Sequence, residues 1–185
     1  AWHYFNHLQG GGEGAYSHRY LVIAPNLIVF DRLREAFEDN AIFNQYPFIP
    51  AEWRAHWDLQ VNLQAEVRPE TSRAVLYLTN VQQLYERTEP EEPNPIQEVM
   101  GPRPIREERT VYEALRERLT ECADLVVIND EAHHVHSDDL EWNQAIAHIH
   151  EGLRHGFGRG LAAQLDFSAT PKDLHGSYFP HIVYD

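Results

Sequence analysis

The sequence has 185 residues, 43% hydrophobic and 24% charged, which is ordinary for one soluble globular domain with a substantial core. Its 15 basic and 29 acidic residues give a formal charge of −14, which excludes a broad basic surface for gripping phosphates and leaves only local contacts with nucleic acid. A lone cysteine excludes an internal disulfide, and there is no signal peptide and no apolar run near the roughly 18 residues of a membrane span, so we expect a cytoplasmic protein without a membrane partner.

The first 84 residues alternate between helical and strand patterns. Apolar residues at helical spacing predict helices over 1–9, over 30–37 and from Asn80 through Leu84. Continuous apolar runs predict buried parallel strands at Tyr20–Ala24 and Ala74–Leu78, and alternation predicts a half-exposed strand at Leu59–Leu63. Residues 41–57 are aromatic and interrupted by proline, and their pattern allows no assignment.

The second half begins with a long irregular segment. Residues 86–109 contain five prolines and many charges, which predicts a loop or insertion. Helices are then predicted over Val111–Cys122 and Glu141–Leu153, and strands over Leu125–Ile128 and Leu161–Phe167. Strands that alternate with helices indicate βαβ units, so residues 1–185 are expected to form one α/β domain with a mainly parallel sheet flanked by helices.

Small or polar residues follow four of the predicted strands. In an open α/β sheet, ligands bind beyond the carboxyl ends of the strands, so the four segments are expected to line one edge. They are Ala24-Pro25-Asn26, Thr79-Asn80, Asp130-Glu131-Ala132-His133 and Ser168-Ala169-Thr170.

The adjacent carboxylates Asp130 and Glu131 suit nucleotide hydrolysis. Neighbouring side chains diverge, so Asp130 can hold Mg²⁺ through its water shell while Glu131 acts as the general base that orients the attacking water. An isolated Asp-Glu pair is more often an ordinary boundary between a strand and a loop. The accompanying His133 and the Ser-Ala-Thr segment favour the catalytic interpretation.

These motifs resemble those of a known motor family. The Asp130–His133 segment is similar to the Walker B element (motif II) of DEAH-type superfamily 2 helicases, and Ser168-Ala169-Thr170 resembles their motif III. The segments ending at Asn26 and Asn80 look like motifs Ia and Ib. Their flanking residues, Ala-Pro-Asn-Leu, Leu-Thr-Asn-Val-Gln-Gln-Leu-Tyr and Phe-Ser-Ala-Thr-Pro-Lys, are most similar to the Res subunit of type III restriction enzymes, over nearly the whole chain.

The resemblance implies a RecA-like P-loop NTPase fold and part of the first motor domain of an ATP-dependent DNA helicase or translocase. It implies that His133 links the nucleotide site to motif III, and that Ser168, Ala169 and Thr170 couple hydrolysis to movement. Pro25, Asn26, Thr79 and Asn80 would border the DNA track. The implied ligands and partners are ATP with Mg²⁺, double-stranded DNA, a second RecA-like domain and a modification methyltransferase subunit.

One required element has no match in these residues. Such a motor needs a glycine-rich loop ending in Gly-Lys-Ser/Thr, but the single lysine, Lys172, follows motif III. The run Gly10-Gly11-Gly12-Glu13-Gly14 precedes a strand and lacks a Gly-Lys step. We therefore expect an N-terminally truncated motor domain that does not hydrolyse ATP alone. Its strand at Leu161–Phe167 would be a bare edge prone to self-association.

Two other functions remain open. A fold that has lost the phosphate loop would be an inactive RecA-like scaffold that binds nucleic acid or protein. A metalloprotein is a weaker alternative, because the ligand spacing matches no established site; its candidate ligands are His133, His134, His136, Asp138 and Asp139. Four aromatic residues could stack on bases, although core packing is the commoner role; they are Trp53, Trp57, Tyr77 and Tyr85.

Overall fold

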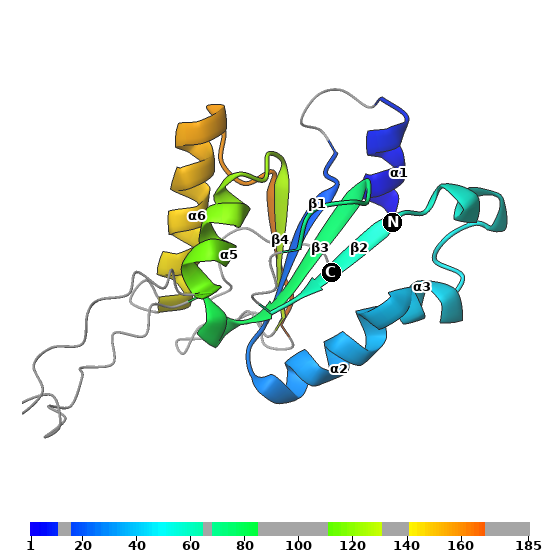
Figure 1. Cartoon of the computed structure of the whole chain (residues 1–185), viewed down its shortest axis with the longest axis horizontal. Coiled ribbons are helices and arrows are strands. Elements are labelled where there is room, and N and C mark those ends of the chain that lie inside the picture. Colours follow the sequence, from blue (N-terminus) through cyan, green and yellow to red (C-terminus); the bar gives the residue numbers. More distant parts are fainter. Residues whose placement is uncertain (11–15, 65–67, 85–110, 131–140, 169–185) are drawn as a thin grey trace, which may run out of the picture.

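One parallel sheet organises the protein, as Figure 1 shows for a computed structural model that describes residues 1–10, 16–64, 68–84, 111–130 and 141–168. The described strands pair in the order β2-β3-β1-β4-β5, and every pair is parallel. Their bounds are β1 Arg19–Ala24, β2 Leu59–Leu63, β3 Ala74–Asn80, β4 Leu125–Asn129 and β5 Ala163–Asp166. The predicted α/β class with a parallel sheet is confirmed.

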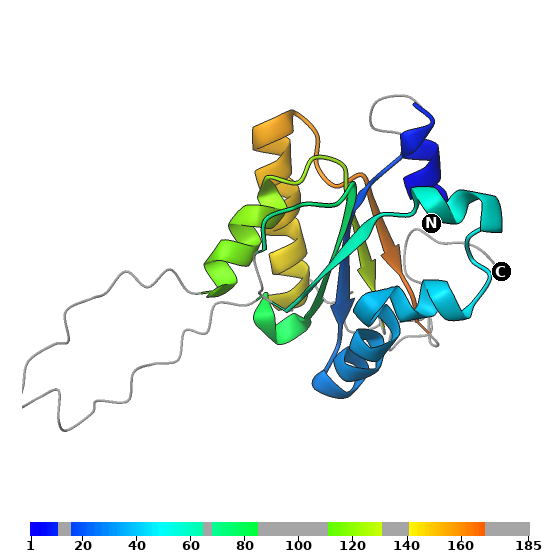
Figure 2. The same cartoon turned by 45° about the vertical axis from the view of Figure 1, so that its right-hand side comes forward.

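Helices cover both faces of the sheet. In Figures 1 and 2, α5 and α6 lie against one face, while α1 and α2 lie on the opposite side. The described α-helices are α1 Trp2–Leu8, α2 Leu27–Phe37, α3 Ala41–Gln45, α5 Val111–Thr120 and α6 Glu141–Phe157. Short 3-10 helices occupy η1 Glu38–Asn40, η2 Ala51–His56 and η3 Val81–Gln83.

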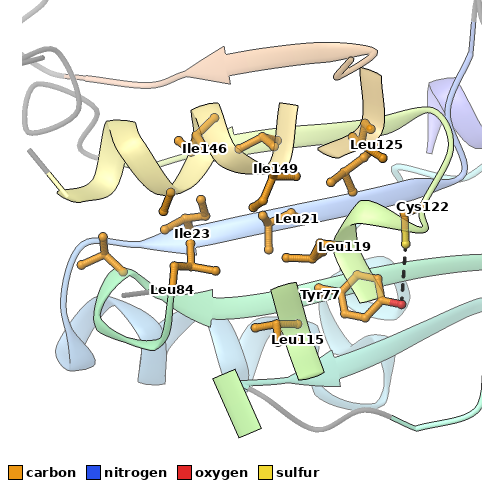
Figure 3. Packing of buried hydrophobic residues seen from close by; sticks show 14 of the residues in the cluster. Leu21, Ile23, Tyr77, Leu84, Leu115, Leu119, Cys122, Leu125, Ile146 and Ile149 are labelled. Atoms are coloured by element: carbon orange, nitrogen blue, oxygen red, sulfur yellow. Dashed lines mark hydrogen bonds between the residues drawn. The ribbon is translucent and has the colours of Figure 1, made fainter. Parts of the chain in front are cut away.

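The face under α5 and α6 holds the larger apolar cluster (Figure 3). Side chains of the central strands, such as Leu21 and Leu125, pack against Leu119 of α5 and Ile149 of α6, and all four are fully buried. Burying a leucine or isoleucine stabilises a fold by about 1.5–3 kcal/mol. This burial explains why the central strands have continuous apolar sequences.

Tyr77 belongs to this core, which confirms the packing interpretation for that aromatic residue. Its hydroxyl donates to Glu70 Oε1 at 2.7 Å, and the Glu70 carboxylate also pairs with Arg19 at 2.6 Å and Arg118 at 3.1 Å. The buried Cys122 thiol lies 4.0 Å from the Tyr77 hydroxyl (Figure 3), and its nearer acceptor is the Arg118 carbonyl at 3.2 Å. These three donors satisfy the hydrogen-bonding capacity of the Glu70 carboxylate, so the cluster has a structural role.

The opposite face explains the segment that its sequence pattern left unassigned. Within residues 41–57, Phe43 of α3 and Trp57, which follows η2, belong to the second apolar cluster, where Trp57 packs against Phe43 and Tyr4. The Trp57 indole donates to Asn40 Oδ1 at 3.2 Å, and the Asn40 amide donates to the Leu59 carbonyl. Trp53 remains half exposed, and Tyr85 lies outside the described residues.

Several boundaries differ from the predictions by a few residues, and two of the differences have a clear physical cause. The predicted helix after β3 starts as the 3-10 helix η3, because β3 runs on through Thr79 and Asn80, which pair in register with β1. Helix α6 extends to Phe157, four residues beyond the predicted end at Leu153, and Gly158 follows it with φ 73°. Glycine adopts that left-handed conformation readily, and it commonly terminates helices.

Acidification is expected to destabilise this fold through His18. Burial lowers the pKa of His18 to about 4, and its ring stacks on His7 with centroids 4.1 Å apart. The unfolded chain, with a histidine pKa near 6.5, therefore binds more protons, and stability falls as the pH falls from about 6.5 towards 4. Urea unfolding should show this loss in the unmodified chain and a smaller one in His18→Gln. An equal loss in both proteins would reject the assignment to His18.

Candidate functional site

The carboxyl ends of β3, β1, β4 and β5 lie in one row. Ile23 of β1 pairs in register with Thr79 of β3 and with Asn129 of β4, and Asn129 pairs with Asp166 of β5. All the strands are parallel, so the segments that follow these residues leave the sheet at the same edge. The predicted convergence of four strand ends is confirmed for the residues that the structure describes.

Two of the predicted site residues emerge next to each other at this edge. Asp130 directly follows β4, is half-buried, and donates its backbone N–H to the Ile23 carbonyl at 3.2 Å. Ser168 follows β5 by two residues, and the intervening Phe167 donates its N–H to the Asn129 carbonyl at 2.9 Å. Backbone hydrogen bonds thus fix where each motif begins. Four other predicted site residues lie outside the described residues: Glu131, His133, Ala169 and Thr170.

At the end of β1, Pro25 is half-buried and Asn26 is exposed. The Asn26 side chain accepts the N–H of Val29 at 3.0 Å and has extended backbone angles, so Asn26 is the N-cap of α2. The predicted nucleic-acid-binding residue therefore has a structural role. The same cap places the N-terminus of α2, with its exposed Leu27 and Ile28, at the carboxyl edge of the sheet.

At the end of β3, Thr79 and Asn80 are buried rather than exposed. Thr79 is 0% and Asn80 is 1% accessible, and the Thr79 hydroxyl donates to the Asn80 carbonyl at 3.3 Å. In this structure their side chains lie below the surface. These buried side chains support the end of β3 at this edge of the sheet. A role for them in DNA binding stays a prediction.

Substitutions at Asn26 separate its capping role from a role in DNA binding. Asn26→Ala is expected to cost about 1 kcal/mol of folding free energy, because the Val29 N–H loses its acceptor. Asn26→Asp keeps the cap and stability but adds a negative charge, so it should weaken DNA binding if phosphate passes here. Chemical unfolding and fluorescence anisotropy with duplex DNA measure the two effects. Unchanged DNA affinity in Asn26→Asp would remove Asn26 from the track.

Three residues that belong to none of the four strand-end motifs also meet at this edge. The Asn129 amide Nδ2 donates to Asp166 Oδ1 at 2.6 Å, and Asn129 Oδ1 accepts the Trp142 indole N–H at 3.3 Å. Asn129 and Trp142 are buried, at 0% and 3% accessibility. The available signal was an asparagine at the end of the otherwise apolar run Leu125–Ile128, but its partners are 13 and 37 residues away in sequence.

Strand β5 is an edge strand of the described sheet, paired with β4 alone. Leu165 and Phe167 are 42% and 58% exposed, and residues 164–167 are all exposed. The strand predicted at Leu161–Phe167 is shorter, and within the described part of the chain its position at the edge of the sheet agrees with the prediction. Self-association through it remains a prediction.

The described residues give little support to other chemistries. Burial raises the pKa of the Cys122 thiol to about 11, which suppresses the reactive thiolate. No group of three His, Cys, Asp or Glu side chains among the described residues is arranged to hold a metal, and the histidines from His133 to His136 lie outside them. None of the described helices combines the length and apolarity that crossing a bilayer requires.

Comparison with known proteins identifies one family. The model of the family described as "Type III restriction enzyme, res subunit" matches residues 4–173, a range that includes every strand among the described residues and all four strand-end segments. No curated protein and no solved structure matches the chain.

Proposed function

Because the chain belongs to the family of type III restriction enzyme res subunits, we propose that it is the part of an ATP-driven DNA motor that carries the hydrolytic carboxylates. The parallel sheet with helices on both faces is consistent with the RecA-like α/β fold of this family's helicase-like motor domain. The observation that carries the proposal is the register between Asn129 and Asp166. It brings the start of motif II beside the start of motif III.

The chemistry begins at the end of β4. Asp130 is a half-buried carboxylate fixed by its backbone to β1, which fits a residue that holds Mg²⁺ through water molecules. When bound, Mg²⁺ neutralises charge on the phosphate oxygens. We assign Glu131, the next residue, as the general base that orients the attacking water and takes its proton.

Coupling to movement is assigned to the neighbouring motif. The Phe167 N–H holds the end of β5 against β4, so Ser168 starts its segment at a constant position relative to Asp130. In this proposal His133 contacts the segment formed by Ser168, Ala169 and Thr170. A change at the γ-phosphate then reaches the second motor domain through motif III.

The DNA track is proposed to run past the ends of β1 and β3. Helix α2 begins there, and the N–H groups of its first turn and the positive end of its dipole suit a phosphate. Pro25 and Asn26 lie at this surface, and the buried Thr79 and Asn80 support it. A net charge of −14 makes such local contacts more favourable than a broad electrostatic surface. Double-stranded DNA is the proposed substrate.

The phosphate-binding loop is proposed to be supplied by another segment of the natural protein. No Gly-Lys-Ser/Thr step occurs in the 185 residues, and β5 is the edge strand of the described sheet, beside which a further parallel strand would lie. The second RecA-like domain and a modification methyltransferase subunit are the remaining proposed partners, with the assembly in the cytoplasm.

The direct test measures ATP hydrolysis by the longest natural protein that carries this chain, with and without duplex DNA. The proposal expects Mg²⁺-dependent turnover that DNA stimulates, and no turnover by residues 1–185 alone. Displacement of a third strand from a DNA triplex would report movement along the duplex. A natural protein that binds DNA but neither binds nor hydrolyses ATP would instead support the scaffold alternative. DNA-independent turnover would reject a DNA-driven motor.

A further inference from the structure

We infer that Asn129 and Asp166 form a positioning pair that transmits the state of the nucleotide site from motif II to motif III. This inference rests on the proposed function and adds two residues to it. Asn129 is the residue before Asp130, and Asp166 lies two residues before Ser168. Their side chains meet at 2.6 Å across the last register pair of β4 and β5.

The chemistry of the partners determines how the Asn129 amide is oriented. The Trp142 indole N–H can only donate, so it must face the amide oxygen, at 3.3 Å. The amide NH₂ then points to the Asp166 carboxylate, which as an ionised group only accepts. Gln164 donates to the same carboxylate at 3.0 and 3.1 Å. In this series of hydrogen bonds Trp142 therefore donates to Asn129, and Asn129 donates to Asp166.

This series of hydrogen bonds joins three elements at the point where the motifs begin. It links α6, β4 and β5 through side chains, and the Phe167 N–H to the Asn129 carbonyl adds a backbone link between the same two strands. Asn129 is fully buried, so its hydrogen bond with Trp142 is shielded from water and directional, while its bond with Asp166 is partly buried because Asp166 lies on the edge strand. A shift of Asp130 along the strand direction would pull on Asp166, and Ser168 would move with it.

A merely structural role for the pair predicts a different result from a coupling role. Loss of folded protein lowers basal and DNA-stimulated turnover by the same factor, so their ratio stays constant. Loss of coupling lowers the ratio itself. The ratio of DNA-stimulated to basal kcat in the longest natural protein that carries this chain is therefore the decisive measurement.

The test exchanges the two partners. Asn129→Asp places two carboxylates against each other and should reduce the ratio about tenfold, while the KM for ATP changes less than about threefold. Asp166→Asn alone keeps an acceptor for the Asn129 amide and should have a small effect. The double variant Asn129→Asp with Asp166→Asn restores one amide–carboxylate pair with Trp142 still donating, and should return the ratio to within about threefold of the unmodified protein.

The matched control is Asn62→Asp. Asn62 is also a fully buried strand asparagine, but it lies on β2 and accepts from Gln60. It should lower thermal stability and leave the ratio unchanged. An unchanged ratio in Asn129→Asp, or a double variant no better than that single variant, would overturn the coupling role while the motor proposal stands. An unmodified protein without DNA-stimulated turnover would overturn both.

Discussion

Replacing Glu131 by glutamine in the natural protein is expected to lower ATP turnover by about 10²–10⁴-fold, the usual contribution of a general base. Glutamine has nearly the same shape but cannot accept the proton of the attacking water. Binding of ATP should persist, because its phosphates are held by other groups. Steady-state hydrolysis and equilibrium binding of a fluorescent ATP analogue measure the two effects separately.

The control for this prediction is Glu151→Gln, which makes the same chemical change on the exposed surface of α6. The Glu151 side chain is 52% exposed and pairs with Arg154 at 3.5 Å, so its loss should leave turnover unchanged. Turnover within twofold of the unmodified protein in Glu131→Gln would remove Glu131 from the catalytic role. Loss of ATP binding would indicate that Glu131 acts in binding instead.

The second large effect is expected at the exposed edge of β5. The 185-residue chain by itself should self-associate, because β5 is the edge strand of the described sheet and its Leu165 and Phe167 are exposed. Leu165→Lys should raise the dissociation constant of the assembly at least about tenfold, since lysine on an edge strand opposes pairing with another chain. Light scattering over a concentration series measures the change.

Phe157→Lys is the matched control for the β5 edge. Phe157 is 45% exposed, close to the 42% of Leu165, but it ends α6 and does not belong to a strand. If association is driven by non-specific hydrophobic contacts, both lysine variants will weaken it equally. A monomeric unmodified chain at high micromolar concentration would reject the prediction.

Local patterns were sufficient for most of the secondary structure. The apolar run Tyr20–Ala24 became β1, which is covered on both faces. The segment Leu59–Leu63 became β2, but its burial does not follow the predicted alternation, because the polar Asn62 is fully buried while Val61 and Leu63 are half-buried. These periodicities follow from the geometry of each element and need no knowledge of its partners. The unassigned residues 41–57 behaved differently, because their fold depends on Trp57 reaching Asn40 and the second core cluster.

The candidate site divides in the same way. Asp130 and Ser168 could be selected from sequence because each follows an apolar strand and belongs to a recognisable motif. Asn26 was also selected, but its capping bond to Val29 became visible only with α2 in place. Asn129 and Asp166 belong to no motif, so nothing in the sequence marked them as a pair.

The sequence by itself determined the alternation of strands and helices, the parallel α/β class and the residues that follow each strand. Only the tertiary structure decided the order β2-β3-β1-β4-β5 and the register that sets Thr79, Ile23, Asn129 and Asp166 in one row. The physical reason is that periodicity records which face of an element is buried. Which elements lie side by side is determined by hydrogen bonds between segments that are tens of residues apart in sequence, and the site is formed where those elements meet.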